Sequence, residues 1–223
     1  MEQIHQSINF KDNFLHGAHK LGLSFSEEVL EKFSLYYEEL CRWDRSINLT
    51  GLRSEKERTV LLFVDSLAGC LALSDKPDGA IVDIGTGGGF PGIPLKLALP
   101  ALDVLLMEPR GNKTAFLHNI IGKLELSGIS VIQSRVEDFH SMLSDEEKCD
   151  VALCKGINIG HVLPFIDRIL KKNGKLVVFR SGNIDNHHQL KDMEVCEEIS
   201  YELPFGYGNR VLSILKHESW MGD

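Results

Sequence analysis

The amino-acid sequence predicts an α/β protein, in which a mostly parallel seven-stranded sheet ends in an antiparallel hairpin and follows a helical extension. Two patterns carry this prediction. In the N-terminal part, Val29, Phe33, Tyr36 and Leu40 recur at the spacing that places side chains on one face of a helix. From Ala80 onward, short apolar runs alternate with helical segments, which is typical of a parallel sheet covered by helices on both faces.

A turn-rich break separates the two patterns. Residues 74–79 read Ser-Asp-Lys-Pro-Asp-Gly, and clusters of these residue types mark loops between elements. We therefore predict an N-terminal helical extension over residues 1–75 and a core domain over residues 76–223. Within the extension, Ser24 and Glu27 have the spacing of a capping box, and a further helix is predicted over 55–73.

The core domain begins with five short apolar runs that we interpret as strands, at 80–84, 104–107, 129–132, 151–154 and 175–179. Helices are predicted between them at 113–126 and 161–170, and Asn173-Gly174 reads as a turn before the fifth strand. The end of the chain differs, because 194–201 and 210–216 read as two strands with no long helix between them. This predicts an antiparallel hairpin at the edge of the sheet.

Composition excludes several classes of protein. The formal net charge of −8 argues against binding of nucleic acid through bulk charge alone, although a local basic face suffices for RNA. Five scattered cysteines without a Cys-x-x-Cys pair indicate reduced thiols and no zinc site. We find neither a secretory signal nor an apolar run of membrane-spanning length. We expect a cytoplasmic monomer with no metal and no membrane partner, and interpret His187-His188 as surface residues.

The sharpest feature is the segment Asp83–Gly92, which reads Asp-Ile-Gly-Thr-Gly-Gly-Gly-Phe-Pro-Gly between a predicted strand and a predicted helix. Glycines let a ligand approach the backbone closely, and a helix N-terminus favours a carboxylate or a phosphate. A dinucleotide site needs a third small residue in its Gly-x-Gly-x-x-Gly frame, where this chain has Phe90. A nucleotide pyrophosphate is therefore the weaker interpretation of this loop.

A methyltransferase loop has an acid two residues before a series of alternating glycines. Asp83, Gly85, Gly87 and Gly89 fit this pattern fully. We therefore predict S-adenosylmethionine as the cofactor, with these residues and Phe90 in its site. The Asp83 carboxylate would meet the amino group of the methionine part, directly or through water. A structural glycine turn without a ligand is the alternative interpretation.

Three more residues extend the predicted cofactor site. Glu108 closes the second strand about twenty residues after the loop, the distance at which an acid binds the ribose hydroxyls in nucleoside-binding sheets. After the third strand, Val136 offers a backbone N–H beside the adenine, and Glu137 or Asp138 offers an acceptor for its amine. A pair of acids at a helix N-terminus is equally explained by the helix dipole.

The predicted sheet resembles the class I methyltransferase fold, and the motifs resemble those of the RsmG (GidB) family. The matching residues are Trp43, Ile47-Asn48-Leu49-Thr50, Asp65-Ser66-Leu67, Asp83–Leu95, Lys113, Phe116-Leu117, Arg135, Glu137, Gly174, Tyr201–Pro204 and Arg210. They span nearly the whole chain. The resemblance implies a bacterial methyltransferase that acts on N7 of guanine 527, in the 530 loop of 16S ribosomal RNA. Its partner would be that RNA or the small ribosomal subunit.

Two positions depart from the family's usual pattern. Leu62 stands where the family usually has histidine, and Cys154-Lys155-Gly156 stands where it usually has Ser-Arg-Ala. Lysine keeps the charge of arginine but not its planar, bidentate geometry. Lys155 ends the fourth strand at the edge where ligands bind in open sheets. It is our candidate for positioning the substrate, through guanine O6 or a phosphate, and an exposed strand-end lysine is the alternative.

The chemistry of guanine N7 needs no general base, because this nitrogen carries a free lone pair and no proton. We therefore nominate no acid–base pair. A set of basic residues is the candidate for a phosphate-binding face: Arg42, Arg45, Arg53, Lys56, Arg58, Arg110, Lys113, Lys171, Lys172, Arg180 and Arg210. The roles of Asn48 and Thr50 stay open between the cofactor pocket and local backbone capping.

Three other functions remain as alternatives to an RNA methyltransferase. A class I methyltransferase acting on a small molecule or a protein would need an aromatic pocket without a basic rim. An oxidoreductase that uses a nicotinamide cofactor is disfavoured by Phe90 in the glycine frame. A non-catalytic RNA- or ribosome-binding protein that kept the fold would bind S-adenosylmethionine without turnover.

Overall fold

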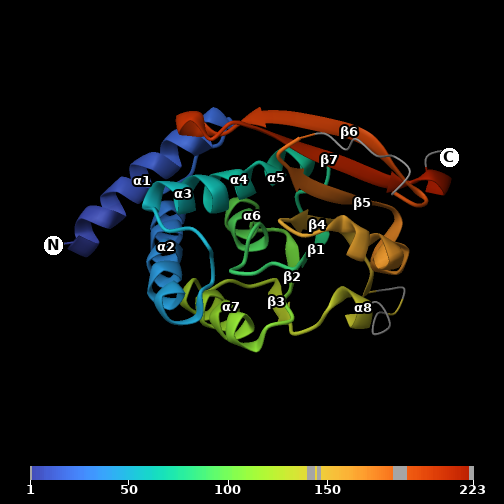
Figure 1. Ribbon diagram of the computed structural model, residues 1–223, viewed down its shortest axis with the longest axis horizontal. Coiled ribbons are helices and arrows are strands. Elements are labelled where there is room, and N and C mark those ends of the chain that lie inside the picture. Colours follow the sequence, from blue (N-terminus) through green and yellow to red (C-terminus); the bar gives the residue numbers. More distant parts are fainter. Residues whose placement is uncertain (1, 140–143, 145–146, 183–189, 221–223) are drawn as a thin grey trace.

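The computed structural model of the chain describes residues 2–139, 144, 147–182 and 190–220, so His187 and His188 lie outside the described residues. A seven-stranded sheet forms its centre (Figure 1). Its strands, in chain order, are β1 Ala80–Ile84, β2 Asp103–Met107, β3 Ile129–Ile132, β4 Cys149–Lys155, β5 Leu170–Arg180, β6 Met193–Glu202 and β7 Asn209–His217.

The strand order in the sheet is β3-β2-β1-β4-β5-β7-β6. Neighbouring strands from β3 through β5 pair in parallel, whereas β7 is antiparallel to both β5 and β6. The order reverses at β1, and the strands on either side of it carry ligands at their carboxyl ends in open α/β sheets. The predicted fold class is confirmed, including the C-terminal hairpin.

The N-terminal part is helical, as predicted. Its helices are α1 Glu2–Lys20, α2 Glu27–Ile47, α3 Glu55–Arg58, the π-helix η1 Thr59–Val64, α4 Asp65–Leu67 and α5 Gly69–Ala72. In Figure 1, α1, α2 and α3 lie at one end of the molecule, and α4 and α5 extend from there toward the sheet. The expected capping box at Ser24 was wrong, because Ser26 is the N-cap of α2 and accepts from the Val29 amide at 3.4 Å. A capping box forms instead at the start of α3, between Ser54 and Glu57.

The remaining helices cover the sheet. They are α6 Gly92–Ala98, α7 Gly111–Lys123, α8 Val136–Phe139 and α9 Ile166–Ile169, with short 3₁₀ turns η3 Ile159–His161, η4 Leu163–Phe165, η6 Pro204–Gly206 and η7 Glu218–Trp220. The single helix expected over 161–170 was wrong. Pro164 lacks the N–H of a helix interior, and the segment breaks into η3, η4 and α9. Asn173, at φ 68°, lies in a bulged start of β5 rather than before it.

The helical extension and the sheet share one hydrophobic core. Its largest cluster contains buried residues from α1, α2 and η1 together with residues of the glycine loop and of strands β1, β2, β4 and β5. Phe63 of η1 is fully buried, and its ring lies 5.0 Å from each of the rings of Phe10, Tyr36 and Phe90. Among the described residues, no helix is both long enough and apolar enough to cross a membrane. The division into parts 1–75 and 76–223 stays a prediction.

The shared core generates a stability prediction. Phe63→Ala leaves a cavity where four aromatic rings meet, and we expect it to lower the free energy of unfolding by about 3–5 kcal/mol. Because Trp43 of α2 packs on Phe116 of α7 at 5.7 Å, its fluorescence and the circular dichroism of the whole chain should change in one transition in urea, measured in a Trp220→Phe background.

The matched control is Leu71→Ala, because Leu71 is 37% exposed and its loss should change the free energy of unfolding by less than about 0.5 kcal/mol. Separate transitions for the two probes would show that the extension and the sheet unfold as independent units.

Candidate active site

The glycine loop after β1 has a backbone that only glycine tolerates well. Gly85, Gly87 and Gly89 all have positive φ, at 71°, 62° and 96°. A Cβ at Gly89 would lie 2.5 Å from the Ile93 side chain and 2.7 Å from the Tyr36 hydroxyl. The sequence pattern therefore reflects both backbone conformation and close packing behind the loop.

The N-terminal extension supports this loop from behind. The Tyr36 hydroxyl of α2 donates to the Gly88 carbonyl at 2.6 Å, and the Tyr36 ring stacks on Phe90 with centroids 5.2 Å apart. Burial raises the pKa of Tyr36 well above its usual value, so the hydroxyl keeps its proton and stays a donor. Phe90, expected in the cofactor site, is 6% exposed and packs in the aromatic core beneath the loop.

Asp83 lies near the end of β1 and is fully buried. One carboxylate oxygen, Oδ2, accepts from the Thr86 hydroxyl at 2.6 Å and from the Gly92 amide at 2.8 Å. The other oxygen, Oδ1, is buried and has no hydrogen-bond partner. Burial raises the pKa of Asp83 to about 6, although the bonds from Thr86 and Gly92 and the charge of Lys155 lower it. An unpaired buried oxygen of this kind fits a cationic ligand group.

Glu108 follows β2 directly and binds the glycine loop. Its Oε2 accepts from the Gly87 amide at 3.0 Å, and its Oε1 accepts from the Arg110 amide at 2.9 Å. A carboxylate has about four acceptor positions, so each oxygen retains capacity for a ligand hydroxyl. Asp83 and Glu108 thus sit at the ends of adjacent strands, on either side of one loop.

A cavity of about 350 Å³ adjoins the loop, and three of the predicted cofactor residues line it: Gly85, Val136 and Glu137. The other residues that line it are Ile84, Met107, Pro109, Ser134, Arg135, Ile157, Asn158, His161 and Val162. Asp83, Gly87, Gly89, Phe90 and Glu108 do not line this cavity.

Sequence reasoning missed the residues that the segment after β4 contributes, which are Ile157, Asn158 and His161. The available signal was their position directly after β4, because ligands bind at the carboxyl ends of strands on both sides of the point where the order reverses.

Lys155, the predicted substrate-positioning residue, lies at the end of β4 and is held inside the protein. Its ammonium donates to the Leu61 carbonyl at 2.7 Å and pairs with Asp65 Oδ2 at 3.0 Å. Asp65 Oδ1 in turn accepts from the Tyr201 hydroxyl at 2.6 Å. Burial raises the pKa of Tyr201, as does the neighbouring Asp65 carboxylate, so the phenol stays a donor. This buried triad, Lys155–Asp65–Tyr201, joins β4, the extension and the end of β6.

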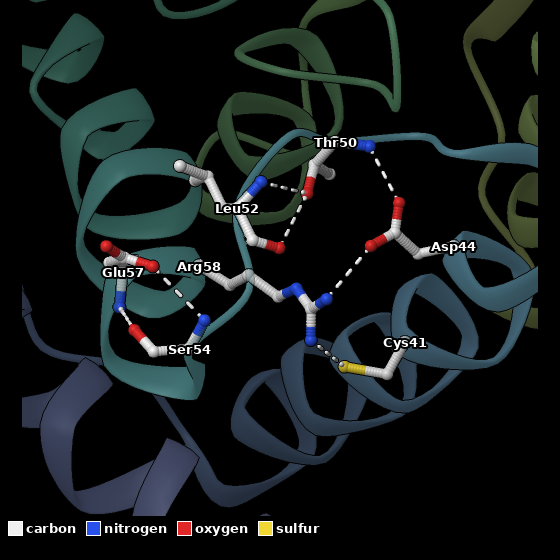
Figure 2. Close-up of polar contacts among 7 residues, drawn as sticks. All are labelled: Cys41, Asp44, Thr50, Leu52, Ser54, Glu57 and Arg58. Atoms are coloured by element: carbon white, nitrogen blue, oxygen red, sulfur yellow. Dashed lines mark hydrogen bonds and ion pairs between the residues drawn. The ribbon is translucent and has the colours of Figure 1, made fainter.

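Figure 2 shows the contacts that hold the loop between α2 and α3. Asp44 accepts from the Thr50 amide at 2.8 Å and pairs with Arg58 at 2.9 Å. The Thr50 hydroxyl accepts from the Leu52 amide at 3.2 Å, and Asn48 is the left-handed C-cap of α2. Thr50 and Asn48 thus stabilise local backbone. The sequence had left their roles open between this and the cofactor pocket. Lys113 donates to the Leu49 carbonyl at 3.5 Å, which ties this loop to α7.

Part of the predicted phosphate-binding set is engaged within the protein. Arg42 pairs with Glu39, Arg58 with Asp44, and Lys171 with Asp150. These ion pairs reduce the charge available to a polyanion at α2, α3 and β5. Lys56 lies instead over the ring of Phe205, with its ammonium 4.8 Å from the ring centroid.

The strand order, the glycine loop after β1 and the acids at the ends of β1 and β2 together define a class I methyltransferase fold. The crystal structure of the ribosomal protein L11 methylase from Lactobacillus delbrueckii subsp. bulgaricus shares this fold with a TM-score of 0.53. The match covers 71% of this chain and 79% of that chain at 15% identity.

Residues 29–212 match the model of the GidB family, described as rRNA small subunit methyltransferase G, and the chain belongs to this family. A protein named ribosomal RNA small subunit methyltransferase G from Lachnoclostridium phytofermentans is 32% identical, over 92% of this chain and 89% of that protein. A protein of the same name from Dictyoglomus thermophilum is 37% identical, over 71% of this chain and 68% of its own length.

The buried triad generates the second stability prediction. Tyr201→Phe removes the hydrogen bond to a charged acceptor, Asp65, and we expect the free energy of unfolding to fall by about 1.5–3 kcal/mol. In an Asp65→Ala background the same change should cost less, because the acceptor is already gone, and urea unfolding of the four proteins gives the coupling energy. Equal costs in the two backgrounds would show that the two side chains do not interact.

Proposed function

We propose that this chain transfers a methyl group from S-adenosylmethionine to N7 of guanine 527, in the 530 loop of 16S ribosomal RNA. The family match over residues 29–212 carries this proposal. The relatives named as small subunit rRNA methyltransferases cover most of the chain. We propose further that the protein acts as a cytoplasmic monomer, on the RNA itself or on the small ribosomal subunit.

The residues at the carboxyl ends of β1 and β2 suit S-adenosylmethionine. The unpaired Asp83 Oδ1 is an acceptor for the amino group of the methionine part, directly or through water. Glu108 keeps acceptor capacity for the ribose hydroxyls while it holds the Gly87 amide. The cavity beside Val136 and Glu137 offers apolar walls and polar groups for the adenine. The positive-φ glycines keep side chains out of the path between these groups.

For this reaction the protein has to position the reacting groups, and it does not have to transfer a proton. When bound, S-adenosylmethionine supplies a methyl group that its sulfonium already activates. Guanine N7 attacks with a free lone pair, so the protein has to hold the base in line with that methyl group. Chemistry on a base within folded RNA also requires that the base leave its stack. No side chain of the site has to accept a proton.

We propose that Lys155 positions the guanine from the end of β4. Two of the three N–H donors of its ammonium are used by Leu61 and Asp65, which leaves one donor for guanine O6 or a phosphate. The triad fixes the direction of the side chain. The planar fork of an arginine is therefore not needed for one contact.

The test of the proposal measures transfer from S-adenosylmethionine with a labelled methyl group. The substrates are 16S rRNA and small subunits from cells that lack the activity, and N7-methylguanine is mapped by chain cleavage. We expect label at one guanine of the 530 loop. Label at another guanine would contradict the site, and absence of label with intact cofactor binding would contradict RNA methylation.

The buried Asp83 predicts how cofactor binding depends on pH. Because burial raises its pKa to about 6, the carboxyl is largely protonated at about pH 5 and loses its attraction for an ammonium group. We expect the affinity for S-adenosylmethionine to fall roughly tenfold between about pH 7 and about pH 5, as measured by calorimetry.

Two variants control this measurement. Asp83→Asn should bind weakly at every pH in this range, because it has no carboxyl to titrate. Glu108→Gln should also bind more weakly, by about 1.5–3 kcal/mol, yet keep the dependence on pH. The assignment of Asp83 fails if the wild-type affinity is flat between these pH values.

Lys155 predicts a different pattern. Lys155→Met should lower the rate of methyl transfer. Because the charge of Lys155 lowers the pKa of Asp83, its loss should raise that pKa. The cofactor affinities are therefore compared at about pH 8, where Asp83 is ionised in both proteins and the affinity should be nearly unchanged. Lys155→Arg keeps the charge but not the compact ammonium that fits between Leu61 and Asp65, so it should restore the rate only in part. Thermal unfolding of both variants shows whether the triad still supports the fold. If the folded Lys155→Met variant transfers methyl groups at the wild-type rate, Lys155 has a structural role only.

A further inference from the structure

Phe205 is an exposed aromatic ring in the turn between β6 and β7. It is 42% exposed, and Leu71 is the one other large hydrophobic residue exposed in the described part of the chain. The register of the hairpin pairs Glu202 with Asn209, so the turn occupies residues 203–208. An isolated exposed apolar residue is common, but this ring also has an unusual backbone conformation and two side-chain contacts.

The turn lies at the edge of the sheet that carries the glycine loop. Arg180, the last residue of β5, pairs with Val211 of β7, and the turn extends beyond that point. Strands β1, β4 and β5 are parallel neighbours, so the carboxyl end of β5 lies at the same edge as the carboxyl end of β1. Figure 1 shows the turn beside α1 and α3. Phe205 therefore lies at the edge of the sheet at which the substrate is proposed to bind.

The backbone holds the ring in place at a cost. Phe205 has φ 58° and ψ 27°, a left-handed conformation that is unfavourable for a residue with a Cβ. The turn around it is closed by hydrogen bonds from the Leu203 amide to the Gly208 carbonyl at 3.0 Å and from the Tyr207 amide to the Pro204 carbonyl at 3.3 Å. Glycine would adopt this conformation without strain, so the conformation of the turn does not account for a phenylalanine at this position.

Two side chains of the extension contact the ring. His16 of α1 stacks on it with centroids 4.9 Å apart and the planes at 28°. Lys56 of α3 places its ammonium 4.8 Å from the ring centroid, and it makes no ion pair among the described residues. Of the neighbouring acids, Glu57 bonds to Ser54 in the capping box, and Glu55 accepts from Asn13 at 3.4 Å. Burial raises the pKa of Glu55 although the charge of Lys56 lowers it, so Lys56 interacts with this acid without forming an ion pair. Three separate elements thus present one aromatic ring with a cation beside it.

An aromatic ring with a cation beside it fits a ligand that has a flat ring attached to an anionic backbone. Unpaired RNA bases stack on aromatic side chains, while lysine and arginine bind the adjacent phosphates. A protein partner would bury a larger apolar patch with several hydrophobic anchors, and here one ring stands among charged residues. The contacts of this ring therefore favour a nucleobase over a protein side chain as its ligand.

We propose that Phe205 is a stacking platform for one unpaired nucleobase of the RNA substrate, next to the site of methylation. The base takes the exposed part of the ring, and Lys56 moves from the ring to the phosphate of that nucleotide. His16 supports the ring from α1. The proposal rests on the proposed function, because it names a second contact with the same RNA. It gives the helical extension a direct part in substrate binding.

The experiment compares Phe205→Ala, Phe205→Trp and the wild type in methyl transfer to small subunits that lack the modification. We expect Phe205→Ala to raise KM roughly five- to a hundredfold, the effect of losing one stacked base, with kcat and cofactor affinity unchanged. Phe205→Trp should restore KM, because it keeps an aromatic face. Lys56→Gln should raise KM by a smaller factor that shrinks at high salt. Leu71→Ala is the control for loss of an exposed apolar side chain.

A second readout separates stacking from a structural effect. Tryptophan at position 205, in a Trp43→Phe and Trp220→Phe background, should lose fluorescence when a base of the bound RNA stacks on it. Wild-type KM in Phe205→Ala overturns the platform, and so does binding of the RNA or of the subunit without quenching. Absence of methyl transfer by the wild type overturns the proposed function and, with it, this inference.

Discussion

The contact between the Tyr36 hydroxyl and the glycine loop is the interaction on which the site depends. Three positive-φ glycines give the loop little conformational preference of its own. Bonds from the Gly89 and Phe90 amides to the Thr86 carbonyl hold part of its shape from within. The bond from Tyr36 to the Gly88 carbonyl and the stacking of Tyr36 on Phe90 support it from outside. Because Tyr36 belongs to α2, the extension packs behind the loop of the proposed cofactor site. A change in the packing of α2 would therefore reach the loop directly.

Charge adds a second constraint at the same edge of the sheet. Asp83 and Glu108 are both buried acids, and the charge of Glu108 raises the pKa of Asp83. The protein stabilises them with backbone amides and one hydroxyl, leaving Asp83 Oδ1 unpaired. Lys155 lowers the pKa of Asp83 while it is itself neutralised by Asp65. A cationic ligand group would complete this arrangement, which is the physical reason for an acid in this position.

Sequence patterns predicted the sheet and the position of the glycine loop well because these depend on local signals. Short apolar runs gave all seven strands within a few residues, and the series Asp83, Gly85, Gly87 and Gly89 located the loop. Element boundaries were less predictable. The helix predicted over 161–170 is interrupted at Pro164. The capping serine of α2 was misplaced by two residues, because Ser24 and Ser26 are both suitable N-cap residues and only the backbone conformation decides between them.

Contacts between distant segments could not be predicted. Lys155 was expected to point at substrate from the end of β4, and nothing in its neighbourhood in sequence shows that Asp65 and Tyr201 meet it. The carbonyl of Leu61 that binds Lys155 belongs to a π-helix, an irregularity with no sequence signature. Thr50 likewise serves Leu52 and Asp44 rather than a ligand.

The triad also explains why a lysine suits this chain at a position where its family usually has arginine. The space between the η1 backbone and Asp65 is filled by one ammonium group, with 2.7 Å to Leu61 and 3.0 Å to Asp65. A guanidinium is wider and planar, and it would have to direct its donors along a different fork. Leu62, the other departure, is partly buried and packs on the core cluster, where an imidazole would need a polar partner. Both substitutions thus lie in η1 or against it, so they form one local adaptation of the contact between the extension and β4.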